Sequence, residues 1–171
     1  CCVDRRRHAR RCVGGILRVR GLSMPIAADH DEIRGLGFVA LWAAYLEETI
    51  DRLLFMLEPV EPYPEAEQQW GIGRKISKAE RLLPRLEFEY RDGMLRDLNA
   101  ARQLFARRNE VIHGRIYGNY DRSALLKSGR PNVPDRQIDS AELYDLANNL
   151  EYAWSALERP MIFQIQRAIQ G

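Results

Sequence analysis

Apolar residues recur at steps of three and four along most of this chain, which is the period of an amphipathic α-helix. The clearest run extends from about Ile33 to Leu57, and a second extends from about Trp70 to Leu83. The proline-rich stretch EPVEPYPE, residues 58–65, cannot continue a helix and separates the two. On the apolar face of the first helix we expect Phe38, Leu41, Trp42, Tyr45, Leu46, Thr49, Leu53, Met56 and Leu57.

Two further helices are predicted in the second half of the chain. Asp92 stands where the N-cap of a third helix is expected, and this helix should end near His113, with Gly114 as its terminating glycine. The stretch DSAELY, residues 139–144, contains an aspartate followed three residues later by Glu142, a capping box that predicts the start of a fourth helix. Pro160 should kink or break that helix before residues 161–169 resume it.

The long connection between the third and fourth helices, residues 114–137, favours a small hairpin around Gly118 and Asn119. A connection of this length in a compact domain is often functional or mobile. The chain lacks the alternation of strands and helices that a parallel sheet requires. We therefore expect an all-α fold, an antiparallel four-helix bundle with a long loop or small hairpin between its third and fourth helices.

Composition changes this picture only at the N-terminus. The chain has 171 residues, of which 46% are hydrophobic and 29% charged, as is typical of one soluble domain with a sizeable core. Residues 1–23 hold all three cysteines, seven arginines and one acidic residue. We expect them to be a basic, disordered or non-native extension before Met24, with a single helical domain over residues 24–171. A targeting peptide and a nucleic-acid-binding arm are the alternatives for the extension.

Without this extension the balance of charge reverses, because 19 basic and 23 acidic residues remain. The net charge of +2 of the whole chain is therefore no argument for nucleic-acid binding by the domain. The domain has no cysteine, which excludes disulfides and thiolate chemistry within it and is typical of a reducing cytoplasm. No stretch approaches the roughly 20 apolar residues of a membrane helix, so we expect no membrane partner.

One group of residues on the third predicted helix is a candidate for chemistry. At about 100° per residue, Arg108 falls within the apolar arc of that helix. An arginine in such a position is costly unless it is paired. Three interpretations are open: it snorkels, it pairs with an acid of the first helix, such as Glu47, Glu48 or Asp51, or it faces a polar cleft that binds an anion. The apolar residues of the arc are Met94, Leu98, Ala101, Phe105 and Ile112.

Asn109 and His113, four residues apart, lie together at the edge of the same arc. Taken alone, a histidine in the last turn of a helix can simply complement the helix dipole. With Arg108, however, the three residues form the pattern R-N-x-x-x-H-G at the end of a third helix. This pattern resembles the R-x4–6-H hallmark of the HEPN superfamily (higher eukaryotes and prokaryotes nucleotide-binding domains), in which a polar residue often follows the arginine.

The resemblance implies a helical domain that, in many members, is a metal-independent ribonuclease and in several a toxin. In such an enzyme His113 would be the acid and base, Arg108 would stabilise the phosphorane, and Asn109 would orient the imidazole or hold a phosphate oxygen. Arg108 and His113 lie about 140° apart around one helix. We therefore expect a homodimer, in which a two-fold axis brings Arg108 of one subunit to His113 of the other.

Basic and aromatic residues near this motif are candidates for RNA binding. Arg107, Arg115 and Arg122 would follow an RNA backbone, while Tyr117 and Tyr120 would stack on unpaired bases. The alternative for each of them is an ordinary solvated loop residue. The same basic rim would also include Lys127, Arg130 and Arg136.

We expect neither a metal nor another cofactor, because the sequence holds no clustered ligand set. The expected partners are a second copy of the chain and single-stranded or loop RNA. In a toxin or defence system, an antitoxin or a nucleotidyltransferase-like protein would join them. Two alternatives remain: a catalytically inactive HEPN-like dimeric module that docks a partner protein, and a purely structural bundle.

Overall fold

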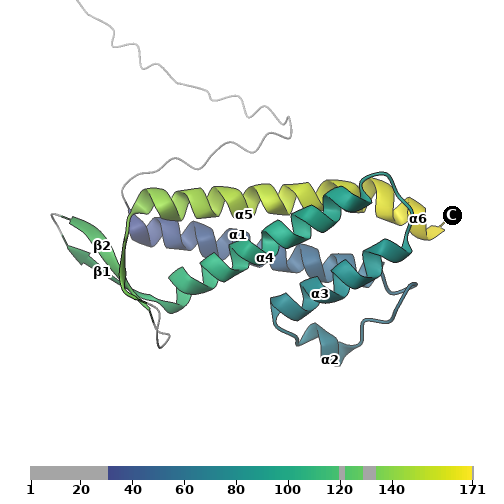
Figure 1. The fold of residues 1–171 in the computed structure, drawn as a ribbon, viewed down its shortest axis with the longest axis horizontal. Helices are drawn as coiled ribbons and strands as arrows, with labels where there is room; N and C mark the ends of the chain where they lie inside the picture. The colour runs from purple at the N-terminus through teal and green to yellow at the C-terminus, as the bar shows by residue number, and fades with distance from the viewer. Residues whose placement is uncertain (1–30, 120–121, 129–133, 171) are drawn as a thin grey trace, which may run out of the picture.

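The computed structural model describes residues 31–119, 122–128 and 134–170 (Figure 1). The predictions for the basic extension, residues 1–23, and for Tyr120 and Arg130 lie outside these residues. In the described residues, three long helices form the body of the molecule, and a shorter fourth helix lies along part of it (Figure 1). They are α1 (Glu32–Met56), α4 (Arg91–His113), α5 (Ser140–Pro160) and the shorter α3 (Ile72–Leu82).

The other helical pieces are short and lie in the connections or at the C-terminus. The α-helix of α5 passes directly into a π-helical turn after Pro160, so the predicted disturbance of the helix at this proline is confirmed. These short pieces are α2 (Glu65–Gln68), the 3-10 turn η1 (Leu83–Arg85), the π turn η2 (Met161–Ile165) and α6 (Gln166–Gln170).

Helices α1 and α5 begin at the same end of the molecule and lie side by side (Figure 1). A Cβ on Gly35 would lie 2.9 Å from the Cβ of Leu143, near the start of both helices. Further along, Thr49 Oγ1 donates to Glu158 Oε1 over 3.1 Å. The first contact lies near the start of both helices and the second lies nearer the end of both, so α1 and α5 run parallel. The predicted helical class is confirmed, but this pair departs from the predicted antiparallel order.

The connection between α1 and α3 makes the parallel arrangement possible. Glu61, shortly after α1, contacts Arg81 at the far end of α3, whereas Gly71 stands at the start of α3. Residues 61–71 therefore run back along α3 before that helix begins (Figure 1). Pro64, one of the prolines that the sequence marked as a helix stop, has an extended backbone (φ −69°, ψ 158°), and the short helix α2 follows it within this segment.

The core lies between the long helices, but α1 is rotated relative to its predicted apolar face. Leu46, Thr49 and Leu53 are buried as expected, whereas Leu41 and Tyr45 are 45% and 43% exposed. Residues 35–46 of α1 contain no charged side chain, so nearly every direction around this half of the helix is apolar. Periodicity alone therefore does not select the buried side. The residues of α1 that complete the buried face are Gly35, Val39, Ala43, Ile50 and Leu54.

The helix ends follow the predicted chemistry only in part. Asp139 accepts the N–H of Glu142 over 2.8 Å, as predicted for the N-cap of α5. The N-cap of α4 is Tyr90, so the prediction of Asp92 in this role is wrong, and Asp92 lies inside the first turn. Gly114 ends α4 in an extended conformation, with φ −77°. Space rather than a left-handed backbone requires this glycine, because a Cβ would lie 2.9 Å from the backbone oxygen of Glu110 and 3.2 Å from that of Lys127.

A small antiparallel sheet follows α4 directly, in the order β1-β2-β3. The predicted hairpin is confirmed as β1 (Arg115–Asn119) and β2 (Arg122–Lys127), with Tyr117 opposite Leu125. A third strand, β3 (Arg136–Ile138), was not predicted, and it pairs with β2 just before α5 begins. The sheet thus fixes the chain at both ends of the long connection.

Candidate functional site

The predicted site lies where α3 stops covering α4. Helix α3 has 11 residues and α4 has 23, so α3 covers only part of its neighbour and its amino end borders an open cleft. The volume of this cleft is about 610 Å³. It is lined by Glu47 of α1, by Gln69, Trp70, Gly71, Ile72, Gly73 and Arg74 around the start of α3, and by Arg108 and Asn109 of α4.

Arg108 is half-buried in this cleft and lacks an acidic partner. Its Nη1 donates to Asn109 Oδ1 over 2.9 Å. Its Nε is buried and has no hydrogen-bond partner in the part of the chain that the structure describes. Over the same residues, no carboxylate forms an ion pair with it. The expected pairing of Arg108 with an acid of α1 is therefore not seen, and the guanidinium borders the cleft instead.

One of those expected acids, Asp51, is occupied elsewhere. Its Oδ2 is 2.8 Å from Lys75 Nζ, and its Oδ1 accepts the hydroxyl of Tyr63 over 2.6 Å. Burial and this bond to the carboxylate raise the pKa of the Tyr63 phenol above its usual range. Glu47 lines the cleft that contains Arg108, and it lies 3.9 Å from Lys75 Nζ.

The amino end of α3 adds positive character to the cleft. Its N-cap is Gly71, which has no side chain to accept the first N–H groups of the helix, and no other described side chain caps them. The first N–H groups of a helix lack partners within the helix and carry the positive end of its dipole. These donors lie in the wall formed by residues 71–73.

His113 lies in the last turn of α4 and is exposed. It does not line the cleft that contains Arg108. Its neighbours Ile112 and Gly114 border a second cleft of about 430 Å³, between the start of α1 and the sheet. Within one chain, therefore, Arg108 and Asn109 line the same cleft, and His113 lines neither of these two clefts. The other residues of the second cleft are Glu32, Ile33, Leu36, Val111, Ile116 and Ala124.

The structure describes the side chains of three of the five predicted RNA-binding residues, Arg107, Arg115 and Tyr117. Arg107 is exposed, and its Nη2 lies 3.7 Å from Glu142 Oε1. Arg115 is exposed at the start of β1. Tyr117 is 48% exposed, and the Nζ of Lys127 lies 5.2 Å from the centre of its ring. For Arg122 the structure describes only the backbone, in β2.

Arg136, which was predicted to extend the basic rim, is engaged in a structural cluster. Its Nε donates to Glu110 over 2.6 Å, and its two Nη atoms donate to the carboxylate of Glu142 over 2.7 Å each. These bonds raise the pKa of the guanidinium above its usual range. Arg136 therefore connects β3 to α4 and α5, and its charge is not available to a phosphate.

A second polar cluster, on α3, was missed by the sequence analysis. Lys75 and Lys78 are each only 4% exposed. The Nζ of Lys78 donates to the carboxylate of Glu67 and, over 2.6 Å, to the carbonyl oxygen of Pro62. It also lies 3.6 Å from Glu61 Oε1. The signal was present, because Lys75 falls between Ile72, Ile76 and Ala79 on the apolar side of α3.

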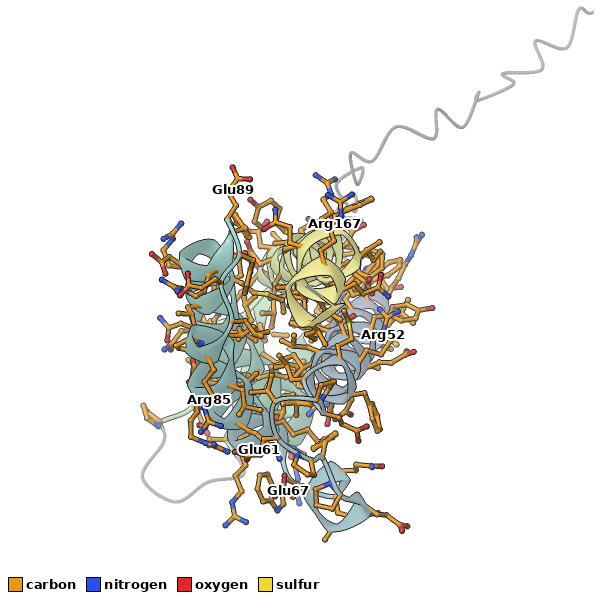
Figure 2. The ribbon with its side chains drawn as sticks, turned by 90° about the vertical axis from the view of Figure 1, so that its right-hand side faces the viewer. Arg52, Glu61, Glu67, Arg85, Glu89 and Arg167 are labelled. Atoms are coloured by element: carbon orange, nitrogen blue, oxygen red, sulfur yellow. The ribbon has the colours of Figure 1, made fainter. Side chains whose placement is uncertain are left out.

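Glu61 contacts three basic residues of this cluster, Lys78, Arg81 and Arg85. It accepts two bonds from Arg81, over 2.7 and 2.5 Å, and lies 3.5 Å from Arg85. Hydrogen bonding to Arg81, with the nearby charges of Arg81, Lys78 and Arg85, lowers the pKa of Glu61 to about 2. Figure 2 shows Glu61, Glu67 and Arg85 gathered at one edge of the molecule, away from Glu89 and Arg167. The cluster attaches the returning segment to α3.

Comparison with models of protein families, with curated proteins and with solved structures yields no match. Over residues 31–119, 122–128 and 134–170, no three His, Cys, Asp or Glu side chains are grouped so as to hold a metal ion. Across the same residues, no helix has both the length and the apolar character needed to cross a membrane.

Proposed function

We propose that this chain is a metal-independent endoribonuclease of HEPN type that acts as a homodimer. The observation that supports this most strongly is the guanidinium of Arg108, which borders an open cleft without a carboxylate partner in the described chain. A half-buried cation with an unpaired N–H costs free energy in the unliganded protein. A phosphate in the cleft would recover this cost, because guanidinium groups bind phosphate oxygens through short charge-assisted hydrogen bonds.

The proposed reaction is a transesterification within the RNA strand. The imidazole of His113 takes the proton of a 2′-hydroxyl, the 2′-oxygen forms a bond to phosphorus, and the bond from phosphorus to the 5′-oxygen breaks. The imidazole returns the proton to that 5′-oxygen. The products are a 2′,3′-cyclic phosphate and a 5′-hydroxyl. Arg108 stabilises the charge on the phosphorane between these steps, and Asn109 holds Arg108 through Nη1.

The proposal requires a second subunit, because His113 and Arg108 do not share a pocket within one chain. An apolar contact surface adjoins His113: the second cleft contains Ile112 and Ile116, and Ile33 at its edge is 83% exposed. Burial of such a surface favours association. A two-fold contact there would place the imidazole of each subunit at the interface, facing the partner.

Replacement of the imidazole tests the proposal. His113→Ala should lower cleavage of a fluorescent single-stranded RNA in EDTA by roughly 10²- to 10⁴-fold, because general acid–base catalysis contributes about that factor. Its circular dichroism and its sedimentation should match those of the parent. Gln103→Ala, at an exposed position of the same helix, is the matched control and should cleave normally. A parent that cleaves no RNA, or a His113→Ala variant as fast as the parent, contradicts the proposal.

A catalytically inactive dimeric binding module is the second candidate function. It is favoured by the exposed Leu41 and Tyr45 of α1, which lie beside the contacting rings of Trp42 and Trp154. This candidate predicts a stable dimer or complex without any cleavage. Tyr45→Glu should then shift the sedimentation of the protein to that of a monomer, whereas in a monomeric parent the candidate fails.

A further inference from the structure

The cleft around Arg108 contains groups that the cleavage chemistry does not use. Trp70 is half-buried in its wall and also borders a neighbouring hollow of about 470 Å³. Arg74 lines both spaces. An indole and two guanidinium groups, Arg74 and Arg108, therefore surround the uncapped amino end of α3. The neighbouring hollow is completed by Gly73, Ser77, Lys78 and Arg81.

Some of the basic side chains in this region are paired with carboxylates, and others are available to a ligand. Lys78 and Arg81 are held by Glu67 and Glu61, as described above. Arg74 is exposed and Arg108 is half-buried, and neither has an ion pair within the described residues. Among the residues that the structure describes, Glu47 is the one acid in the lining of the cleft. The available positive groups are thus Arg74, Arg108 and the first N–H groups of α3.

We propose that this cleft is a nucleotide subsite for single-stranded RNA that is complete within one subunit. A backbone phosphate lies between Arg74, Arg108 and the N–H groups at the start of α3, and the adjoining base stacks on Trp70. Helix amino ends bind phosphates through free N–H groups, and aromatic side chains bind the faces of bases regardless of sequence. This inference rests on the proposed function only in taking the ligand to be RNA.

The subsite assigns different roles to the two parts of the dimer. Each subunit binds and orients the strand with its own Trp70, Arg74 and Arg108, and the partner supplies the imidazole. Trp70 and Arg74 are therefore positioning residues. Binding should need one intact subunit surface, whereas cleavage should also need a partner.

Fluorescence anisotropy with a labelled 2′-deoxy oligonucleotide tests binding separately, because this probe has no 2′-hydroxyl and is not cleaved. Trp70→Leu and Arg74→Gln should each weaken binding by roughly tenfold, the loss expected for one stacked base or one phosphate contact. Arg96→Gln, at an exposed position early in α4, is the control and should bind as the parent does. Unchanged affinity in both test variants overturns the subsite.

Gly71→Asp distinguishes a binding role of the helix end from a structural one. Gly71 has φ −63°, and a Cβ built there meets no described atom within 4 Å. The new carboxylate would cap α3, so the melting temperature should stay equal or rise slightly. It would also occupy the N–H groups and repel phosphate, so the oligonucleotide should bind roughly tenfold more weakly. Parent-like affinity in this variant overturns the part assigned to the helix end.

Two further comparisons separate the possible failures. His113→Ala should bind the oligonucleotide like the parent, so loss of cleavage with retained binding leaves the subsite intact. If cleavage depends on His113 while binding ignores Trp70 and Gly71, the subsite is wrong and the ribonuclease proposal survives. Inorganic phosphate should compete only weakly, because it lacks the base. If it competes as strongly as a mononucleotide does, the stacking role of Trp70 is overturned.

Discussion

Lys75 and Lys78 on α3, and Arg108 on α4, are all cations withdrawn from water, but their surroundings differ. The two lysines are almost fully buried, and each lies within 3.9 Å of two carboxylates, Glu47 and Asp51 for Lys75 and Glu61 and Glu67 for Lys78. Arg108 is half-buried, meets an amide oxygen, and leaves its Nε unpaired within the described chain. The first arrangement is complete without a ligand, and the second is not.

This difference separates charges that hold the fold from charges that are available to a ligand. Within the lysine cluster, Lys78 attaches residues 61–67 to α3, and this helix begins at Ile72. That starting point leaves Arg108 uncovered. The same contrast applies to the arginines near the sheet, since Arg136 is paired on both sides whereas Arg115 is exposed. Basic character in the sequence is therefore a poor guide to binding until the partners are known.

The largest effect predicted from this contrast concerns Arg108→Met. Cleavage should fall by roughly 10²- to 10³-fold, the usual loss when one donor to a developing oxyanion is removed. The free energy of unfolding should stay the same or increase, because an unpaired charge is replaced by packing. Cleavage assays and urea denaturation of the same preparation measure the two effects. A large loss of stability would mean that Arg108 belongs to the fold after all.

The next largest effect concerns the lysine cluster. Lys78→Met should lower the free energy of unfolding by about 3 kcal/mol, because Glu67 and Glu61 lose the cation that compensates their charges. Urea denaturation measures this change, and Lys127→Met, at an exposed position of β2, is the control that should differ little from the parent. A Lys78→Met variant as stable as the parent would contradict the claim that the lysine cluster stabilises the fold.

The smallest predicted effect is the response of the cluster to acid. The pKa of Glu61 in the folded chain is about 2, against 4.5 for the free side chain. A lowered carboxyl pKa stabilises the fold fully above pH 4.5, and this stabilisation is lost as the pH falls towards 2. Glu61→Gln should reduce the pH dependence of the melting temperature between these values. An identical pH profile in the variant would show that Glu61 is not held by Arg81 in solution.

The sequence predicted the helices better than their arrangement. The bounds of α1 and the end of α4 follow from periodicity, because these helices are long and amphipathic enough to show it. The parallel course of α1 and α5 depends on the proline-rich segment after α1, which runs back along α3. The local sequence pattern predicts that the helix stops there, but not the direction that the chain then takes. Strand β3 was missed since its three residues are stabilised by pairing with β2 and by the contacts of Arg136, both distant in sequence.

For the candidate site, the helical-wheel position of Arg108 was informative, but the sequence did not indicate which residues line the cleft around it. Arg108, on the apolar side of α4, does line a cleft, which one of the interpretations of its wheel position predicted. Residues 70–74 form most of the rest of that lining, and the sequence predicted for them only the start of a helix. The cleft lies at the amino end of α3, which is shorter than α4 and covers only part of it, and no local pattern in the sequence shows where two helices overlap.

Mixed dimers test the central claim most directly. Arg108→Ala and His113→Ala subunits, each inactive alone, are refolded together in equal amounts and assayed for metal-free RNA cleavage. Half of the dimers would then be mixed, and each would keep one composite site with both residues, so about a quarter of the parental activity should return. No recovery, in a mixture shown to contain mixed dimers, would contradict a site shared between two subunits.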